Sequence, residues 1–305
     1  MPINISTSPA VFQWQPAAWL RVCGSDAANF LQGQFTNDLR GLAAVGVGER
    51  PRAVYGLWLS VKGKVVADSF VVRGAEVNEF WLGSYFSPAA MIRERLDGHI
   101  IADDVLIEDQ TADWRGLSVL GAGAGAVVER LKPKGCFVFS GRRTRAGGWE
   151  CVFPAGAFPA GVNLDDAMGS LDAESVERLR IREGIPAIPT DVGPSDLPNE
   201  AGLETEAISY TKGCYLGQEV MARLKSMGQV RRRLLRVRGG DAQWPAIPTA
   251  IFVGSRQVGE LRSAIRDGDR GWIGLAMLSL VHLAPEAALS FSLGSSAQLL
   301  LVDTP

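Results

Sequence analysis

The residues best suited to chemistry gather between positions 199 and 223, around a single cysteine. Cys214 follows Lys212 and a glycine, and a helical pattern with Glu219 in its first turn begins shortly afterwards. A helix N-terminus and a neighbouring ammonium both favour a thiolate over a thiol, and the thiolate is the nucleophilic form. Gly213 is interpreted as the residue that permits the turn, through a positive φ. The alternative is that Cys214 fills a small apolar gap, as many single cysteines do.

The sequence offers little for a metal centre. The other cysteines stand at positions 23, 136 and 151, and no two cysteines have the CxxC spacing of a zinc or cluster site. His99 and His282 are the only histidines, which excludes a multi-histidine metal site and a histidine-based catalytic system. We therefore expect no metal site, and we interpret the four cysteines as reduced thiols.

Composition and charge describe an ordinary globular protein. The chain has 305 residues, of which 47% are hydrophobic and 21% charged, so it has room for a large core and two or three compact units. The net charge of −2 argues against a protein that binds nucleic acid over its whole surface. The first ten residues lack the regions of a secretory signal, and no apolar run reaches the length of a bilayer. We expect a cytoplasmic chain with no direct membrane contact.

A basic band follows the cysteine segment. Its members are Arg223, Lys225, Arg231, Arg232, Arg233, Arg236 and Arg238. Such a band suits a phosphate, a polyglutamate tail or an RNA backbone. The alternative is a solvated strand face, because arginines alternate with apolar residues at its end. Within the band, Arg223 on the predicted helix is the residue that we expect at a binding site.

A glycine-rich segment at 121–126 lies between a predicted strand and a helical pattern. It fits GxGxxA, a permissive form of the dinucleotide fingerprint, and the downstream pair Arg142 and Arg143 would then suit a 2′-phosphate. However, repeated parallel βαβ units do not surround it. We therefore interpret the segment as a strand-to-helix turn within an α+β unit.

The elements that must position these residues alternate short strands with helices. Strand patterns at 53–60 and 65–72 flank a tight turn at 62–64, which indicates a hairpin. An amphipathic helix is predicted over 172–183, and a proline-rich irregular connection leads from it to the cysteine segment. From about position 230, short strand patterns separated by glycine-rich or polar turns indicate a small β-barrel.

Several motifs mark a known family. The segment 212–219 reads Lys-Gly-Cys-Tyr-Leu-Gly-Gln-Glu and resembles the signature of the YgfZ family. Similar matches cover an opening motif at 24–38, the turn at 62–64 and the approach to the cysteine at 182–200. The YgfZ family itself resembles the folate-dependent T-protein, the aminomethyltransferase of the glycine cleavage system. Its eukaryotic relatives are mitochondrial iron–sulfur assembly factors.

The resemblance implies a fold as well. It implies an α+β ring in the aminomethyltransferase style, in which two α+β subdomains and a C-terminal β-barrel enclose a central cavity. We assign residues 1–112 to the first subdomain, 113–228 to the second, which carries the cysteine loop, and 229–305 to the barrel.

The function implied by the resemblance is support of iron–sulfur enzymes, including enzymes that modify tRNA, with tetrahydrofolate as ligand. Cys214 would be the reactive group, with Lys212 stabilising its thiolate. The cofactor-binding positions implied are Tyr215, Gln218, Glu219, Arg223 and Arg182. We expect a monomer whose partners are iron–sulfur client proteins and whose contact with tRNA is indirect. A folate-dependent aminomethyl or methyl transferase and a non-catalytic adaptor are the alternatives.

Asp68 is the second candidate for chemistry. An aspartate on the strand after the first hairpin handles protons at the folate in the T-protein, and a buried carboxylate suits that task. The alternative is a strand aspartate that faces solvent. Arg182 stands where T-protein-like sequences often carry an acidic residue that helps to fix the pterin. Because of Arg182, and because the aromatic residues associated with folate do not align, we expect weak binding of tetrahydrofolate.

Overall fold

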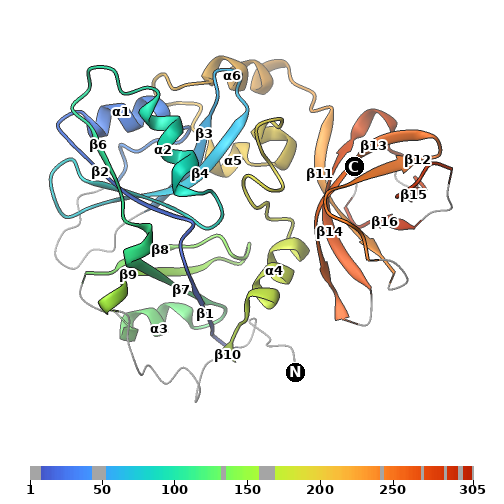
Figure 1. The fold of residues 1–305 in the computed structure, drawn as a ribbon, viewed down its shortest axis with the longest axis horizontal. Coiled ribbons are helices and arrows are strands. Elements are labelled where there is room, and N and C mark those ends of the chain that lie inside the picture. Colours follow the sequence, from blue (N-terminus) through green and yellow to red (C-terminus); the bar gives the residue numbers. More distant parts are fainter. Residues whose placement is uncertain are drawn as a thin grey trace.

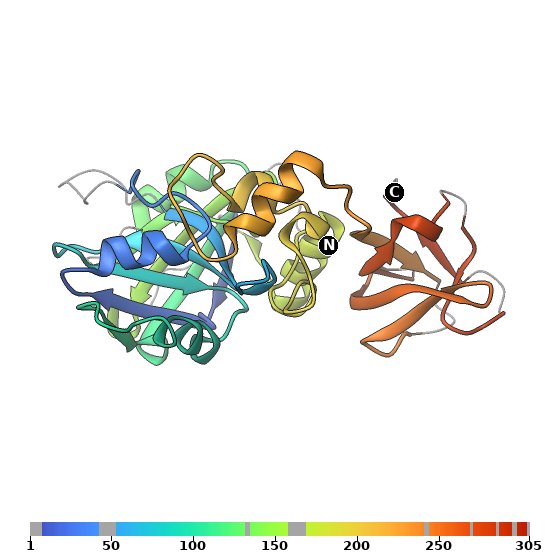
Figure 2. The same cartoon turned by 90° about the horizontal axis from the view of Figure 1, so that it is seen from above.

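Two five-stranded sheets and a closed barrel make up the protein. The computed structural model describes residues 8–42, 53–131, 135–157, 169–240, 244–268, 271–284, 287–294 and 298–303. The two sheets lie together on one side, the barrel lies on the other, and helix α4 lies between them (Figure 1). The view from above shows the same separation (Figure 2). Within the described residues, none of the helices is long and apolar enough to cross a membrane.

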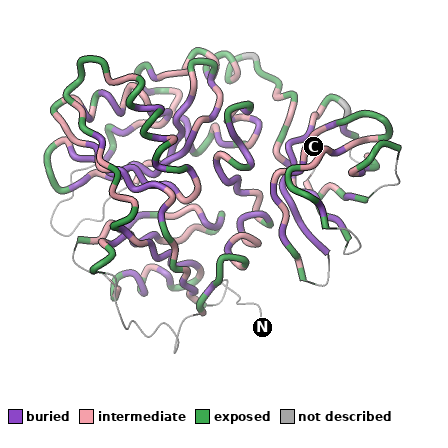
Figure 3. Tube along the Cα trace, in the orientation of Figure 1, coloured by how far each residue is buried: buried purple, intermediate pink, exposed green. Residues whose placement is uncertain are grey.

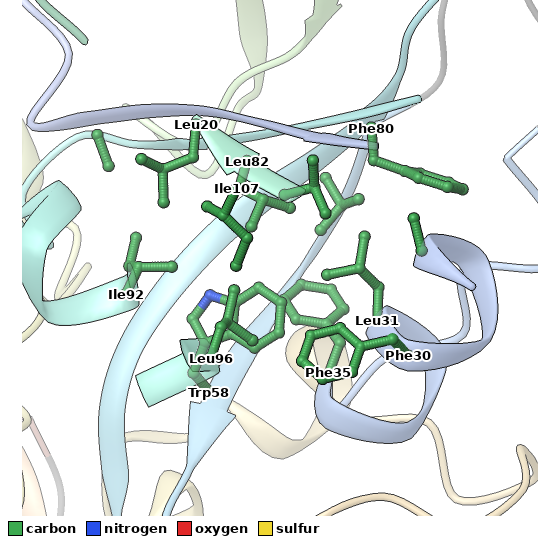
Figure 4. Packing of buried hydrophobic residues seen from close by; sticks show 14 of the residues in the cluster. Leu20, Phe30, Leu31, Phe35, Trp58, Phe80, Leu82, Ile92, Leu96 and Ile107 are labelled. Carbon is green, nitrogen blue, oxygen red and sulfur yellow. The ribbon is translucent and has the colours of Figure 1, made fainter. Parts of the chain in front are cut away.

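The first sheet has the order β3-β4-β5-β2-β6, with antiparallel neighbours throughout. Its strands are β3 (Ala53–Leu59), β4 (Val65–Arg73), β5 (Phe80–Ser84), β2 (Ala18–Cys23) and β6 (Leu106–Asp109). The predicted hairpin is confirmed as β3 and β4. Helices α1 (Ala27–Gln34) and α2 (Ala89–Asp97) pack on one face, where Leu31, Trp58 and Ile92 are fully buried (Figure 4).

The second sheet has the order β10-β1-β7-β9-β8. Its strands are β10 (Gly169–Ser170), β1 (Ala10–Trp14), β7 (Trp114–Leu120), β9 (Gly148–Pro154) and β8 (Phe137–Ser140). β1 precedes every strand of the first sheet in the chain, yet it pairs with β7 in the second. Helix α3 (Ala124–Leu131) packs on one face. Because β7 has antiparallel partners on both sides, the glycine-rich segment after it is a turn of an α+β unit, as predicted.

An aromatic cluster joins the two sheets. The Trp19 ring of the first sheet lies 5.9 Å from the Trp81 ring, 5.7 Å from the Trp114 ring and 6.4 Å from the Phe139 ring, between centroids. Trp114 and Phe139 belong to the second sheet, and all four residues are buried. Figure 3 shows buried segments (purple) in the interior of both sheets, whereas much of the outer loops is exposed (green). Burial of large aromatic side chains dominates the stability of such a contact.

An irregular connection leads from the sheets to the barrel. The predicted amphipathic helix is confirmed as α4 (Ala173–Arg182), and the Asp172 side chain caps it by accepting a hydrogen bond from the Ser175 amide at 2.8 Å. Two further helices, α5 (Glu204–Ala207) and α6 (Gln218–Met227), follow. Short 3₁₀ helices are η1 (Thr111–Asp113), η2 (Ala155–Ala157), η3 (Pro198–Ala201) and η5 (Leu280–His282).

The C-terminal unit is a closed six-stranded barrel, as predicted. Its strands are β11 (Arg232–Gly239), β12 (Thr249–Val253), β13 (Arg256–Arg266), β14 (Trp272–Ser279), β15 (Leu289–Ser290) and β16 (Leu299–Leu301). β15 is a strand of two residues, too short to carry an alternating pattern in the sequence. Charged side chains join the barrel to the irregular connection, with Arg262 donating to Asp196 at 2.6 Å.

Candidate functional site

Lys212 clamps the cysteine loop onto the end of α1. Its Nζ donates hydrogen bonds to the carbonyl oxygens of Gln32 at 2.6 Å, Phe35 at 2.7 Å and Asn37 at 3.0 Å. These three bonds use every proton of an ammonium group. The Gln32 carbonyl lies in the last turn of α1, at the negative end of the helix dipole, which favours a cation there. The arrangement differs from the predicted one, because the protons point at backbone carbonyls and not at the Cys214 thiol.

The clamp leaves Cys214 exposed on the loop. The glycine with positive φ is Gly217 (φ 86°), not Gly213, so the predicted position of the turn is wrong. Gly217 has no room for a side chain, since a Cβ atom would lie 2.9 Å from the Ser60 carbonyl oxygen. The turn therefore packs directly on the β3–β4 hairpin, and α6 begins at Gln218 beside that hairpin (Figure 1).

The other residues predicted around the loop occupy different surroundings. Tyr215 is buried, and burial raises the pKa of its hydroxyl. Gln218 is half-buried, whereas Glu219 and Arg223 are exposed on α6. Arg182 lies on α4 and pairs with Asp267 of the barrel, with its Nε 2.7 Å from Asp267 Oδ1.

Asp68 is buried on β4, and the alternative of a solvent-facing aspartate is wrong. One of its oxygens, Oδ2, accepts from the Tyr55 hydroxyl at 3.0 Å. The other, Oδ1, accepts from the hydroxyls of Ser84 at 2.8 Å and Ser87 at 2.6 Å. Burial raises the pKa of Tyr55 well above its usual value, so the phenol keeps the proton that it donates. The carboxylate is thus held in one orientation by three hydroxyl groups.

Asp68 lines a cavity of about 230 Å³ between the two sheets and α4. The lining residues are Phe12, Asp68, Tyr85, Phe86, Arg142, Arg143, Ala173, Val176, Glu177, Arg180, Ile185 and Pro186. A second cavity of about 230 Å³ adjoins the first, because Arg142, Ile185 and Pro186 line both. A concave site with apolar walls and a few converging polar groups is typical of a small-molecule site.

Three arginines of this cavity were missed as site residues. Arg142 forms an ion pair with Glu206, and its guanidinium carbon lies 3.7 Å from the centre of the Tyr55 ring. Arg180 donates to Asp191 at 2.5 Å. Arg143 is also buried in the wall. The pair Arg142 and Arg143 was considered only for a dinucleotide phosphate, because nothing local in the sequence shows which face of the molecule the segment joins.

The predicted site residues therefore lie in three places: the cavity, the cysteine loop with α6, and the contact of α4 with the barrel. Asp68 lies in the cavity, whereas Cys214, Lys212, Tyr215, Gln218, Glu219, Arg223 and Arg182 are not among the residues that line it. In the part of the chain that the structure describes, no group of three or more His, Cys, Asp or Glu residues is arranged to hold a metal ion. The structure thus has a concave cavity beside Asp68 and, apart from it, an exposed thiol at Cys214.

Lys212→Met is expected to change how stability depends on pH. Burial lowers the pKa of Lys212 to about 8 in the folded chain, whereas an unfolded lysine titrates near ~10.4. Between those values the unfolded state binds more protons, so the unfolding free energy of the unaltered chain rises with pH relative to that of the variant. Urea unfolding of both proteins at several pH values across this interval is the measurement. If the difference in unfolding free energy between the two proteins stays constant with pH, the prediction is wrong.

Comparison with known proteins gives one family and one fold. Residues 4–153 match the family model described as GCVT N-terminal domain. The mitochondrial iron-sulfur cluster assembly factor IBA57 of Homo sapiens is 30% identical over 290 residues, with 88% of this chain and 77% of that protein covered. The tRNA-modifying protein YgfZ of Edwardsiella ictaluri is 29% identical over 256 residues, with 76% and 71% covered.

A solved structure agrees with the architecture. The glycine cleavage system aminomethyltransferase T from Bartonella henselae superposes with a TM-score of 0.78 and covers 98% of this chain and 86% of that one. At 16% identity the likeness shows the fold alone. The predicted α+β fold with a C-terminal barrel is confirmed.

Proposed function

We propose, from the premise that this chain belongs to the family of IBA57 and YgfZ proteins, that it assists the assembly or maintenance of iron–sulfur enzymes, including enzymes that modify tRNA. One relative is named as an iron-sulfur cluster assembly factor and the other as a tRNA-modifying protein, and these names support the proposed process. The reactive group is Cys214, and the clients are proteins that dock at its loop. We further propose that the chain acts as a cytoplasmic monomer and reaches tRNA only through those clients.

The observation that carries this proposal is an exposed cysteine on a clamped loop. A thiol that only fills a gap is buried, as Cys151 is, whereas Cys214 is exposed. Holding the loop takes one buried lysine with three hydrogen bonds to backbone carbonyls. Such an anchor reduces the conformational freedom of the segment that presents the thiol, and a pre-organised segment loses less entropy on docking.

The Asp68 cavity is the proposed site of tetrahydrofolate. Its chemistry fits the ligand: aromatic side chains flank the space, a carboxylate would accept hydrogen bonds from ring N–H groups, and guanidinium groups would suit the carboxylates of a glutamate tail. The adjoining cavity, lined by Arg142 and Arg145, extends the space for that tail. A reduced folate supplies a one-carbon unit when it is bound. The chain itself supplies Asp68, which the Tyr55, Ser84 and Ser87 hydroxyls hold in place.

The experiment that tests the function uses cells that lack their own member of the family. Producing this chain in them is expected to restore the activity of iron–sulfur enzymes, measured on a tRNA-modifying enzyme through its modified nucleoside. An enzyme without an iron–sulfur cluster serves as control. If the chain accumulates to normal levels but restores neither the activity nor the cluster content of the enzyme, the proposal is wrong.

Asp68→Asn is expected to weaken binding of tetrahydrofolate by about tenfold or more, because an amide group puts donors where the ligand presents its own donors. Calorimetry with purified protein gives the dissociation constants. Asp97→Asn on the exposed end of α2 is the matched control and is expected to leave them unchanged. If the unaltered chain shows no heat of binding and no thermal stabilisation by tetrahydrofolate, this cavity is not a folate site.

One observation favours a second function. Asp68 is a buried carboxylate at a cavity, which suits proton transfer in a folate-dependent aminomethyl or methyl transferase. In that case Cys214 has no chemical role. Transfer of a one-carbon unit from folate by the purified chain, lost in Asp68→Asn and retained in Cys214→Ser, would establish this alternative.

A further inference from the structure

The cysteine loop, the turn of the β3–β4 hairpin and helix α6 form one continuous surface. A Cβ atom at Gly217, at the end of the loop, would lie 2.9 Å from the Ser60 carbonyl oxygen of the hairpin. A Cβ atom at Gly63, in the hairpin turn, would lie 2.9 Å from the Cβ of Val220 on α6. The three segments therefore contact one another directly, and Figure 1 shows the hairpin beside α6.

Helix α6 buries one face and exposes the other. Met221 is fully buried, and Val220 and Leu224 pack with it against the core between the sheets. The exposed positions of the helix are Glu219, Ala222, Arg223, Lys225 and Ser226. The outer face of α6 is therefore open to a partner, next to the exposed thiol of Cys214.

Basic side chains dominate this surface. Lys62 is exposed in the hairpin turn, and Arg223 and Lys225 are exposed on α6. Over the described ranges of the chain, none of these three side chains forms an ion pair, and Lys225 only contacts the Tyr210 ring, with its Nζ 4.1 Å from the ring centre. Glu219 is the one carboxylate of α6. The surface is thus positive, although the whole chain has a net charge of −2.

Two exposed arginines elsewhere in the protein are compensated locally. Arg40 pairs with Asp38 at 2.6 Å, and Arg93 pairs with Asp97 at 3.2 Å. The cations around the cysteine loop have no such partner. Unpaired charges of one sign attract a partner of the opposite sign and raise the rate of encounter.

A buried cation lies beneath the same surface. The Lys212 ammonium donates to three carbonyl oxygens, and in the part of the chain that the structure describes no carboxylate accepts from it. Its pKa of about 8 leaves it mostly protonated at neutral pH. Because carbonyl groups carry no net charge, the charge of Lys212 adds to the positive potential at the loop.

Val61 gives this positive surface an apolar point. The side chain is 68% exposed in the hairpin turn, beside Lys62. A protein partner can bury such a side chain among charged neighbours, since protein interfaces combine an apolar centre with a polar rim. An RNA backbone gains little from Val61 and is repelled by Glu219. The combination favours a protein partner over RNA.

We propose that this surface docks an acidic segment of a protein partner, whose carboxylates face Lys62, Arg223 and Lys225. We call it the Cys214 face, and its exposed members are Val61, Lys62, Cys214, Glu219, Arg223 and Lys225. The inference rests on the proposed function, in which client proteins dock at the cysteine loop. It adds that the docking segment of a client is recognised by its negative charge.

The test uses the Cys214 thiol to report which charges approach it. Three short peptides each carry one cysteine, blocked as a mixed disulfide with thionitrobenzoate and flanked by glutamates, by lysines or by neutral residues. The Cys214 thiolate attacks the peptide sulfur, a disulfide between Cys214 and the peptide forms, and the coloured thionitrobenzoate anion leaves. Absorbance gives the rate, and mass spectrometry identifies the cysteine that has reacted.

The glutamate peptide is expected to react with Cys214 about tenfold faster than the lysine peptide at low ionic strength, with the neutral peptide between them. The ratio of the two rates is expected to approach one in about 1 M salt, where charges are screened beyond about 3 Å. Because all peptides meet the same thiol, its intrinsic reactivity cancels from the ratio. Equal rates at low ionic strength, or a faster lysine peptide, overturn the inference, whether or not any variant folds.

The double variant Lys62→Glu, Arg223→Glu is expected to bring the ratio to about one or below and to reduce the restoration of iron–sulfur enzymes in cells. Arg130→Glu is the matched control. Arg130 is exposed in the last turn of α3, far from α6 in Figure 1, so its replacement is expected to keep both the ratio and the restoration. If the double variant keeps the ratio of the unaltered chain, the inference is wrong.

A short RNA with the same blocked thiol at one end, and with as many negative charges as the glutamate peptide, separates the two kinds of partner. If the RNA reacts with Cys214 faster than the glutamate peptide does, the Cys214 face binds RNA and the inference is overturned.

The inference and the proposed function fail in different ways. If the peptides react at equal rates while Cys214→Ser still abolishes the restoration in cells, only the inference fails. If the unaltered chain restores no iron–sulfur enzyme, the proposed function fails, whatever the rates of the peptides.

Discussion

Cys214→Ser is expected to reduce the support of iron–sulfur enzymes in cells to the level seen without the chain. Serine has nearly the same size but is a far weaker nucleophile and metal ligand at neutral pH. Because the Cys214 side chain is exposed, its replacement leaves the core unchanged, and the melting temperature is expected to stay the same. Activity of a tRNA-modifying iron–sulfur enzyme in the complemented strain is the measurement.

Cys23→Ser is the matched control for this prediction. Cys23 is half-buried at the end of β2, away from the loop, and its replacement is expected to leave the support intact. Alkylation rates, read site by site by mass spectrometry, are expected to be highest at Cys214 among the four cysteines. Full support by the Cys214→Ser variant would favour the adaptor, in which the loop binds partners without thiol chemistry.

Asp191→Ala is expected to lower the free energy of unfolding by about 3–5 kcal/mol, the range for a buried ion pair that loses one partner. The Asp191 side chain is fully buried and accepts from Arg180 at 2.5 Å and from the Ala187 amide at 2.8 Å. It also accepts from the Ser263 hydroxyl of the barrel. Removing the carboxylate leaves the buried Arg180 with Glu177 as its remaining ionic partner and removes the hydrogen bonds to Ala187 and Ser263.

The matched control is Arg93→Ala, which removes the exposed ion pair with Asp97 on α2. An exposed pair of this kind contributes only about 0.3–0.5 kcal/mol. Urea unfolding, followed by circular dichroism and by tryptophan fluorescence, measures both variants. If Asp191→Ala costs no more than the control, Asp191 does not stabilise the contact between α4, the irregular connection and the barrel.

The fold was largely predictable because most of its elements depend on local patterns. The hairpin of β3 and β4, the helix α4 and the presence of a C-terminal barrel follow from residue spacing within short windows. The motif at 212–219 was sufficient to indicate the family. Within the barrel, β15 is a strand of two residues whose existence depends on its neighbours.

The site was predicted only in part, because its geometry comes from contacts between distant segments. By itself the sequence determined that Cys214 lies in a glycine-rich turn before a helix and that Asp68 lies on a strand. Only the tertiary structure decided that Lys212 is hydrogen-bonded to the end of α1. Its partner Gln32 lies 180 positions earlier in the sequence. It also decided that Asp68 is buried and that Arg143 reaches the same cavity. Hydrogen bonding and burial of these groups depend on which surfaces meet when the sheets pack, and no local pattern encodes that packing.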